Sequence, residues 1–544
     1  MLEGLVQNDY QLTIGSILGR MRSVHHGSSV VTLREPGRLT RIDFGALAER
    51  VDKLAGALQQ LGVQDGDRVA TLMWNTQEHL ELYYAIPSIG AVLHTLNLRL
   101  FSEQLSYIIN HAEDTIIFVD DSLVEVLAKV IGDATSVRHV VVVGDGDGEC
   151  AELPGALRYE ELLAAQPAGF DYPQINERAA AGLCYTSGTT GNPKGVLYSH
   201  RSSVLHAVGG CMADTHGICW HDRILPVVPM FHANAWGLPY VAGMAGADMI
   251  MPSRFLQPEP LVTLIETERV TVAGAVPTIW WDVLRYADQH HSDLSSLRTV
   301  PCGGAAVPRS LMEAFHERHG VEIVQAWGMT EMSPIGSVAR PPRGVTGEAA
   351  WEYRSTAGRV APMVEARIVD ADDQVLPWGD PTIGDLEVRG PWIASAYYGD
   401  DSGEKFHDGW LRTGDMAAID LEGYIRIGDR SKDVIKSGGE WISSVELENE
   451  LMGHPAVLEA AVIAKPDEKW SERPLACVVP EPDASLSAEE LTEFLRTRVA
   501  KWWLPDEYAF IDEVPKTSVG KFDKKVLRAR LAAGELAGRV NVHP

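Results

Sequence analysis

The chain has 544 residues, of which 47 are basic and 75 are acidic, so its formal net charge is −28. Hydrophobic residues make up 45% of it and charged residues 22%, as in ordinary globular proteins. The acidic balance counts against a nucleic-acid-binding protein, which would need clustered lysine and arginine to neutralise phosphates. A nucleotide can still bind, because local N–H groups and one or two cations outweigh a distant net charge.

The six cysteines are scattered along the chain, and no two of them form a Cys-x-x-Cys pair. Their spacing therefore argues against the usual zinc and redox motifs. The N-terminus lacks the basic and then apolar layout of a secretion signal, and no stretch approaches 18 uninterrupted apolar residues. These features predict a cytoplasmic protein without a transmembrane segment, while peripheral contact with a membrane stays open.

Strand-like and helix-like segments alternate from about Asp67 to Glu331. The predicted strands are Arg68–Trp74, Ala91–Leu96, Thr115–Val119, Arg138–Val143, Val270–Ala275 and Val321–Gln325. The predicted helices are Glu78–Ala85, Ser122–Ile131, Leu261–Arg269 and Arg309–Arg318. This alternation is typical of an α/β fold with parallel strands.

The pattern changes after Glu331, where strand-like pieces follow one another without clear helices between them. Val364–Val369 and Asp385–Arg389 are such pieces, and they predict a small β-rich subdomain. A short, highly charged segment, Asp429–Asp433, then fits a surface connection. The elements predicted beyond it are helix Ser444–Met452, strands Val457–Ala464 and Pro474–Val479, helix Ala488–Val499 and a terminal helix after Asp523. This last part has about one hundred residues, a size that can fold alone.

One loop carries an unusual density of hydrogen-bond donors. The segment Tyr185–Gly195 reads YTSGTTGNPKG and holds three glycines, four serine or threonine hydroxyls and one lysine. Glycines let the backbone approach an anion closely, and hydroxyl and N–H groups donate to phosphate oxygens. The spacing is not that of a Walker P-loop. A flexible polar turn is the alternative, but the position directly after an apolar strand favours a phosphate-binding loop.

This loop resembles the phosphate loop of the adenylate-forming superfamily, which includes acyl-CoA synthetases, luciferases and peptide-synthetase adenylation domains. Further motifs resemble those of the family and follow in the family's order. They are Pro229–His232 (PMFH), Gly303–Ala305 (GGA), Trp327–Glu331 (WGMTE), Thr413–Asp415 (TGD), Gly428–Asp433 (GDRSKD), Lys436–Trp441 (KSGGEW) and Pro515–Lys521 (PKTSVGK). The resemblance covers nearly the whole chain and is strongest to the bacterial medium- and long-chain fatty acyl-CoA synthetases.

The resemblance implies a particular domain organisation and activity. Residues 1–429 would form a large adenylation domain of stacked α/β sheets with the β-rich subdomain, residues 430–433 a hinge, and residues 434–544 a small mobile α+β domain. The protein would be an acid–thiol ligase that uses ATP, Mg²⁺ and coenzyme A. It would convert a medium- or long-chain fatty acid to acyl-AMP with release of pyrophosphate, and then to the coenzyme A thioester. Relatives in this branch also imply a homodimer.

The resemblance also implies roles for single residues. Lys521 would bridge the substrate carboxylate and the α-phosphate, and Thr330 would donate to that phosphate. Glu331 would hold Mg²⁺ with help from Thr186, because Mg²⁺ prefers carboxylate, hydroxyl and phosphate oxygens. Asp415 would bind the ribose hydroxyls. The other implied ATP-binding residues are Ser187, Gly188, Thr189, Thr190, Gly191, Lys194, Gly303, Gly304, Gln325, Ala326, Trp327, Arg430, Lys432 and Lys436.

The acid and the thiol would occupy two further regions. His232 would lie beside the reacting carboxylate, next to Ala233, and Trp236 would be either an aromatic gate or simple core packing. Lys432 would be the hinge residue and Lys436 would act in thioester formation. Gly438, Gly439 and Trp441 would line the coenzyme A tunnel.

Two features that the sequence lacks narrow the range of expected substrates and acceptors. Amino-acid-activating relatives place an aspartate in the stretch that Ala233–Ala235 occupies here, and an unpaired ammonium in an apolar pocket would be costly. The stretch between Glu331 and Asp415 shows no insertion of the kind found in fatty acyl-AMP ligases, which favours free coenzyme A as the acceptor. Two alternatives stay open: a ligase for a short, branched, aromatic or sulfur-containing acid, and a catalytically inactive nucleotide-binding protein.

Overall fold

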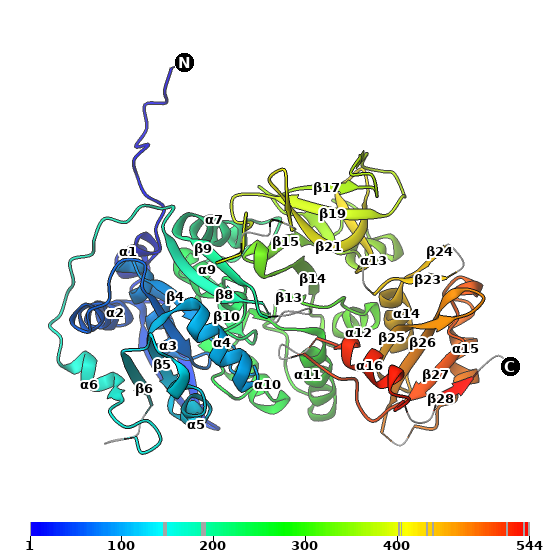
Figure 1. The fold of residues 1–544 in the computed structure, drawn as a ribbon, viewed down its shortest axis with the longest axis horizontal. Helices are drawn as coiled ribbons and strands as arrows, with labels where there is room; N and C mark the ends of the chain where they lie inside the picture. Colours follow the sequence, from blue (N-terminus) through cyan, green and yellow to red (C-terminus); the bar gives the residue numbers. More distant parts are fainter. Residues whose placement is uncertain are drawn as a thin grey trace.

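The computed structural model describes residues 2–144, 150–186, 192–400, 403, 405–430, 433–437, 440–482, 484–517, 521–536 and 539–541. Its strands form four sheets, three in the larger part of the chain and one near the C-terminus, and helices pack around them (Figure 1). No helix within these ranges is long and apolar enough to cross a membrane.

A seven-stranded sheet contains the first predicted strands. Its order is β7 (Leu157–Arg158), β6 (His139–Val143), β5 (Asp114–Asp120), β3 (Arg68–Leu72), β4 (Val92–Thr95), β8 (Ala180–Tyr185) and β9 (Gly195–Ser199). The strands are parallel except for the pair β8 and β9. The helices that follow are α3 (Gln77–Ser88), α4 (Ser102–Ala112) and α6 (Tyr159–Ala164). The predicted α/β alternation is therefore confirmed.

One predicted helix in this region, Ser122–Ile131, is broken. The segment forms a 3₁₀ turn at Asp121–Leu123, a short α5 at Val124–Ala128 and another 3₁₀ turn at Ile131–Asp133. The break occurs at Leu123, whose φ of −110° and ψ of 3° are not helical.

A five-stranded sheet lies beside the first and brings the N-terminal segment together with later ones. Its order is β12 (Val272–Gly274), β10 (Arg223–Pro226), β11 (Asp248–Met251), β1 (Ser29–Glu35) and β2 (Arg38–Asp43). Its helices are α1 (Ile14–Ser23), α2 (Phe44–Gln60), α7 (His200–Cys211), α9 (Leu238–Ala245), α10 (Pro258–Thr267) and α11 (Pro277–His290). One hydrophobic core joins the two sheets: Val69 and Leu93 enter it from the first, Ile224 and Met249 from the second, and Tyr84 from α3.

A ten-stranded sheet carries most of the site described below. Its main order is β13 (Val300–Gly303), β14 (Ile323–Gly328), β15 (Ile335–Val338), β16 (Gly358–Val360), β22 (Tyr424–Arg430), β21 (Trp410–Ile419), β19 (Gly384–Arg389), β17 (Glu365–Val369) and β18 (Val375–Leu376), with β20 (Phe406–His407) paired to β21. Strands β13 and β14 are parallel, and the other pairs are antiparallel. Helix α12 (Arg309–His319) connects the parallel pair.

The β-rich part also contains one short helix that the sequence pattern did not indicate. Helix α13 (Glu348–Arg354) lies between β15 and β16. It is short and buries only Ala350 fully, so its sequence shows little of the apolar periodicity that indicates a helix.

The C-terminal part has its own six-stranded sheet. Its strands are β23 (Ile435–Ser437), β24 (Glu440–Ile442), β25 (Val457–Asp467), β26 (Ser471–Pro480), β27 (Glu507–Phe510) and β28 (Arg539–Asn541), with helices α14 (Ser444–Met452), α15 (Ala488–Leu495) and α16 (Lys524–Ala532). Helix α15 ends four residues before the predicted Val499. The chain leaves the ten-stranded sheet after β22 and enters this one at β23. Figure 1 shows the C-terminal part beside α11 and α12, where Arg285 of α11 and Glu481 form an ion pair of 2.8 Å.

Candidate active site

The ends of β13 and β14 provide a closely packed backbone surface. A Cβ atom on Gly303 would collide with the carbonyl oxygen of Ala326, so only glycine fits there. Gln325 is buried, and its side chain is used within the fold: Oε1 accepts from the N–H of Val307 at 2.5 Å, and the amide nitrogen donates to the carbonyl oxygen of Thr356. Backbone and small residues therefore form the face on which the adenine is predicted to lie.

Asp415 is held in place by the indole of Trp327, a contact that was not predicted from the sequence. Trp327 Nε1–H donates to Asp415 Oδ2 at 2.9 Å, and the backbone N–H of Asp415 donates to Thr413 Oγ1 at 3.1 Å. Asp415 is buried on β21 and lies opposite Arg430 of β22 in the register of the sheet. This arrangement fixes the orientation of the carboxylate beside the end of β14.

Thr330 and Glu331 form a buried 3₁₀ turn (Thr330–Met332) that two tyrosines hold in place. Tyr198 donates to the carbonyl oxygen of Thr330 at 2.7 Å, and Tyr397 donates to Glu331 Oε1 at 2.5 Å. Burial and the neighbouring Glu331 raise the pKa of Tyr397, so its phenol remains a donor at neutral pH. Neither tyrosine was predicted from the sequence, because both lie outside the family motifs.

The base of the predicted phosphate loop is closed by hydrogen bonds between its two ends. The N–H of Thr186 donates to the carbonyl oxygen of Lys194 at 2.9 Å, and the N–H of Lys194 donates to Thr186 Oγ1 at 3.4 Å. Lys194 Nζ pairs with Asp400 at 2.7 Å and lies 4.9 Å from the ring centroid of Tyr397. The predicted loop residues Ser187, Gly188, Thr189, Thr190 and Gly191 lie outside the described residues.

Lys521 reaches from the C-terminal part to the end of β13. A Cβ atom on Gly304 would lie 3.2 Å from Lys521 Cε, and Gly304 has a φ of +85° that favours glycine. Burial, aided by the positive charge of Lys521, lowers the pKa of His232 to about 3. His232 is therefore neutral at physiological pH, and it lies close enough to Lys521 for that charge to act on it.

The predicted acyl-binding residues lie next to this cluster. Ala233 and Trp236 belong to α8 (Ala233–Trp236). The Trp236 ring lies 3.6 Å from the position that a Cβ would take on Gly274, and 3.8 Å from the corresponding position on Gly303. The indole thus occupies the space beside the ends of β12 and β13.

Lys436, predicted to act in thioester formation, and Trp441, predicted to bind coenzyme A, lie elsewhere. Lys436 of β23 faces Trp441 of β24, and both side chains are exposed. The N–H of Lys436 donates to Glu472 Oε2 at 2.7 Å. Figure 1 shows β23 and β24 at the upper edge of the C-terminal part, away from α16, which follows Lys521. Lys432, Gly438 and Gly439 lie outside the described residues, and the side chain of Arg430 is not described.

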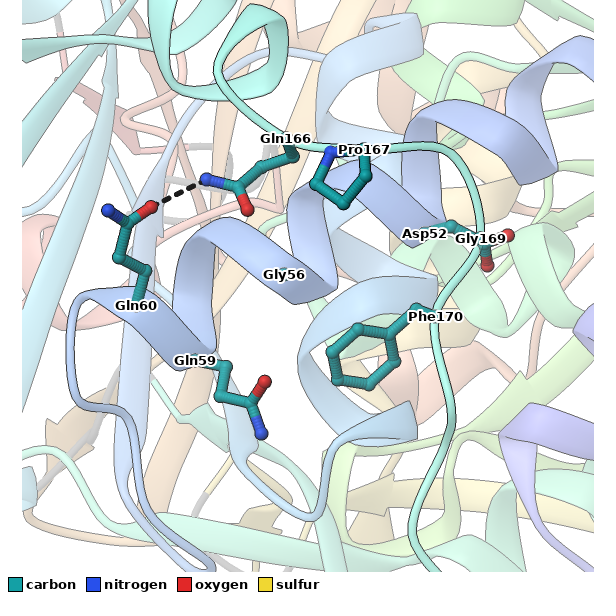
Figure 2. A pocket seen from close by; sticks show the side chains of 8 residues that line it. All are labelled: Asp52, Gly56, Gln59, Gln60, Gln166, Pro167, Gly169 and Phe170. Carbon is teal, nitrogen blue, oxygen red and sulfur yellow. Dashed lines mark hydrogen bonds between the residues drawn. The ribbon is translucent and has the colours of Figure 1, made fainter.

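Two other observations concern metals and cavities. Within the described ranges, no group of three or more histidine, cysteine, aspartate or glutamate side chains could hold a metal ion. Glu331 would therefore be a single protein carboxylate that shares Mg²⁺ with phosphate oxygens, as is usual for this ion. A hollow of about 310 Å³ lies beside α2 and the segment 166–170 (Figure 2), but no predicted site residue lines it.

Residues 23–398 match the model of the AMP-binding enzyme family, and residues 446–521 match that of the AMP-binding enzyme C-terminal domain. The chain belongs to the AMP-binding enzymes. This is the adenylate-forming superfamily whose motifs it carries, and the predicted fold class, with a large N-terminal part and a small C-terminal part, is confirmed.

Relatives of this AMP-binding enzyme match it over almost its whole length. A 3-methylmercaptopropionyl-CoA ligase from Ruegeria lacuscaerulensis is 44% identical, over 95% of this chain and 97% of the relative. A medium-chain-fatty-acid–CoA ligase from Ectopseudomonas oleovorans is 42% identical, over 97% of each chain. The crystal structure of the anthranilate CoA ligase AuaEII in complex with anthranoyl-AMP has a TM-score of 0.87 and 27% identity, over 97% of this chain and 100% of that one. AMP-forming ligases of this kind use ATP and coenzyme A with Mg²⁺.

Proposed function

We propose that this AMP-binding enzyme, an acid–thiol ligase, joins a medium- or long-chain fatty acid to coenzyme A. In the first step a carboxylate oxygen would attack the α-phosphorus of ATP, and the bond to pyrophosphate would break. In the second step the sulfur of coenzyme A would attack the acyl carbon of the adenylate, and AMP would leave. The observation that carries the proposal is the position of Lys521, which reaches Gly304 beside a neutral His232.

The first step needs cationic groups, because both reactants are anions. Lys521 would bind the incoming carboxylate and the α-phosphate together, and Thr330 would donate to the phosphate. His232 is neutral, so it can orient the carboxylate through one N–H without adding a second full charge. Glu331, held by Tyr397, and Thr186 offer the hard oxygen ligands that suit Mg²⁺. When bound, Mg²⁺ neutralises charge on the phosphates as pyrophosphate leaves.

The nucleotide would be held on the ten-stranded sheet. Asp415, oriented by Trp327, has the acceptor oxygens needed for ribose hydroxyls. Gly303 and Ala326 provide backbone surface for the adenine. The other residues proposed for ATP binding are Gly304, Gln325, Lys194, Arg430, Lys432, Lys436 and the loop Ser187, Gly188, Thr189, Thr190 and Gly191.

The second step needs another arrangement, because β23 and β24, which carry Lys436 and Trp441, lie away from α16, which follows Lys521. We propose that residues 434–544 rotate relative to residues 1–429 about a hinge at 430–433, with Lys432 as the hinge residue. Lys436 would then act in thioester formation, and Gly438, Gly439 and Trp441 would line the coenzyme A tunnel. We further propose a cytoplasmic homodimer.

A sulfur-containing acid is the second candidate substrate. It is supported by the 44% identity to a relative named for 3-methylmercaptopropionyl-CoA. The two candidates differ greatly in the length of the acid, so the acyl pocket would have to differ in depth.

The test is pyrophosphate release with ATP and Mg²⁺ across straight-chain acids of increasing length and 3-methylmercaptopropionate, with and without coenzyme A. Turnover that requires coenzyme A and is highest with a medium or long fatty acid is the expected result. Highest turnover with 3-methylmercaptopropionate would establish the second candidate instead. No release with any acid would overturn the ligase assignment in favour of an inactive nucleotide-binding protein.

A further inference from the structure

The turn that follows His232 has an unusual backbone. Ala233, Asn234, Ala235 and Trp236 have φ values of 43°, 52°, 49° and 56°, and Gly237 follows at 74°. The ψ values of Asn234 and Ala235 are 45° and 42°, so the segment is a left-handed helical turn. For residues with a Cβ this conformation costs free energy at each position, and consecutive non-glycine examples are rare. Such a turn persists only where its surroundings hold it.

Asn234 is the residue that ties the turn to the core. It is buried, and its Oδ1 accepts from Tyr83 at 3.3 Å and from Cys184 Sγ at 3.1 Å. The Tyr83 hydroxyl has one proton and also lies within hydrogen-bonding distance of the carbonyl oxygen of Met230, so Asn234 and Met230 share this donor. Asparagine tolerates the left-handed region better than most residues, so it combines an acceptable backbone with a side-chain anchor.

Asn75 holds the segment that enters the turn. Its Nδ2 donates to the carbonyl oxygens of Pro226 and Val228 at 2.7 and 2.9 Å, and its Oδ1 accepts from the N–H of Met230 at 2.7 Å. These three hydrogen bonds and the anchor on Asn234 fix the chain on both sides of His232.

We propose that Asn234, supported by Asn75 and Tyr83, is a positioning residue for the acyl site. By holding the left-handed turn, it keeps His232 beside Lys521 and the Trp236 indole beside Gly303. This inference rests on the proposed function, because it assigns the turn to binding of the acid rather than of ATP. The residues proposed to contact the nucleotide lie on other strands, so a relaxed turn should impair use of the acid and leave use of ATP unchanged.

The test compares pyrophosphate release by four variants while acid and ATP are varied separately. Asn234→Ala is expected to lower kcat/KM for the acid about 10- to 100-fold, since small misplacements of reacting groups cost this much, and to change the KM for ATP less than twofold. Asn234→Gly keeps the backbone conformation but loses the anchor, so it should regain thermal stability over Asn234→Ala without regaining acid turnover. Tyr83→Phe should show the same acid-specific loss, smaller in size.

Tyr84→Phe is the matched control. Tyr84 is as buried as Tyr83 and donates to the carbonyl oxygen of Pro239 at 2.8 Å, outside the turn. The Tyr84→Phe variant should lower the melting temperature about as much as Tyr83→Phe does, without changing the KM for the acid. The inference is overturned if the two tyrosine variants behave alike, or if Asn234→Ala affects acid and ATP equally. A parent enzyme that releases no pyrophosphate with any acid would instead overturn the proposed function, and this inference with it.

Discussion

The hydroxyl of Tyr397 donates to Glu331 Oε1 at 2.5 Å, although the two residues are 66 positions apart in the chain. The same tyrosine ring lies 4.9 Å from the ammonium of Lys194. One aromatic side chain therefore connects the carboxylate proposed to hold Mg²⁺ with the cation at the base of the phosphate loop.

Replacement of Tyr397 by phenylalanine should weaken the use of MgATP. The buried carboxylate of Glu331 would lose a hydrogen bond that fixes its orientation, a loss of about 1 kcal/mol or more. We expect the KM for MgATP to rise roughly five- to tenfold, while the KM for the acid stays within twofold. Tyr398→Phe is the control, because the Tyr398 ring contacts His111 rather than Glu331. An unchanged dependence on MgATP in Tyr397→Phe would show that the hydrogen bond has no part in binding.

Replacement of Lys521 by alanine should separate the two steps. The variant would lack the positive charge proposed to bridge the two anions, so pyrophosphate release should fall by about 100-fold or more. Thioester formation from supplied acyl-adenylate and coenzyme A should proceed at the parental rate. Lys525→Ala, which removes an exposed lysine of α16, should leave both steps unchanged. Parental acid activation by Lys521→Ala would refute the proposed role.

The ion pair between the larger part of the chain and the C-terminal part should influence formation of the acyl-adenylate. Arg285→Ala removes the 2.8 Å ion pair with Glu481. Half-exposed pairs contribute at most about 1 kcal/mol, so pyrophosphate release should slow by about two- to fivefold. Thioester formation from supplied adenylate should not slow.

The double variant Arg285→Glu/Glu481→Arg restores the pair with reversed charges and should recover the parental rate of the first step. Arg269→Ala, which breaks an exposed pair with Asp293 within the larger part, is the control. A loss in the first step that the reversed pair fails to restore would mean that Arg285 acts in some other way.

Acid should destabilise the protein through buried histidines. Burial lowers the pKa of His206 and His232 to about 3 and that of His79, His200 and His216 to about 4. Between these values and about 6.5, the pKa in the unfolded chain, the unfolded state binds more protons, so the free energy of unfolding falls as pH falls. Each such histidine contributes up to about 1.4 kcal/mol per pH unit in that window.

His216→Gln removes one of these groups, and urea unfolding at pH 7.5 and 5.5 measures the effect. The difference in free energy of unfolding between the two pH values should shrink by about 1 kcal/mol relative to the parent. His290→Gln, at an exposed position of α11, should leave the difference unchanged. A difference in His216→Gln equal to that of the parent would mean that this histidine does not remain neutral in the folded protein.

Local patterns made much of the fold predictable. Strands such as β5 and β6 are β-branched runs, and helices such as α12 and α14 show clear apolar periodicity, so they were expected close to their observed bounds. Helix α13 was missed because it is short and weakly amphipathic. The N-terminal strands β1 and β2 were not expected; β1 pairs with β2 and with β11, which comes more than 200 residues later.

In the candidate site, resemblance to family motifs led to the predictions at Gly304 and Lys521, which the structure places close together. The site was not predictable where a residue depends on a distant neighbour. Trp327 donates to Asp415 across 88 positions, and Tyr83 reaches Asn234 across 151. Spacing rules describe single helices, strands and loops, so they carry no information on such contacts. The left-handed turn after His232 was equally unpredictable, because alanine and tryptophan do not indicate that backbone conformation.

The ten-stranded sheet joins the end of β13, the end of β14 and the middle of β21 into one framework. Recognition of AMP would thus reside in this sheet, whereas Lys521, the group proposed to make that nucleotide reactive, comes from the C-terminal part, in the segment before α16. Affinity for the nucleotide and the rate of acid activation can then change independently. Substitutions in the C-terminal part can alter turnover while leaving the nucleotide-binding surface unchanged. An inhibitor shaped to the sheet alone would compete with ATP at every stage of the cycle, whatever acid the enzyme activates.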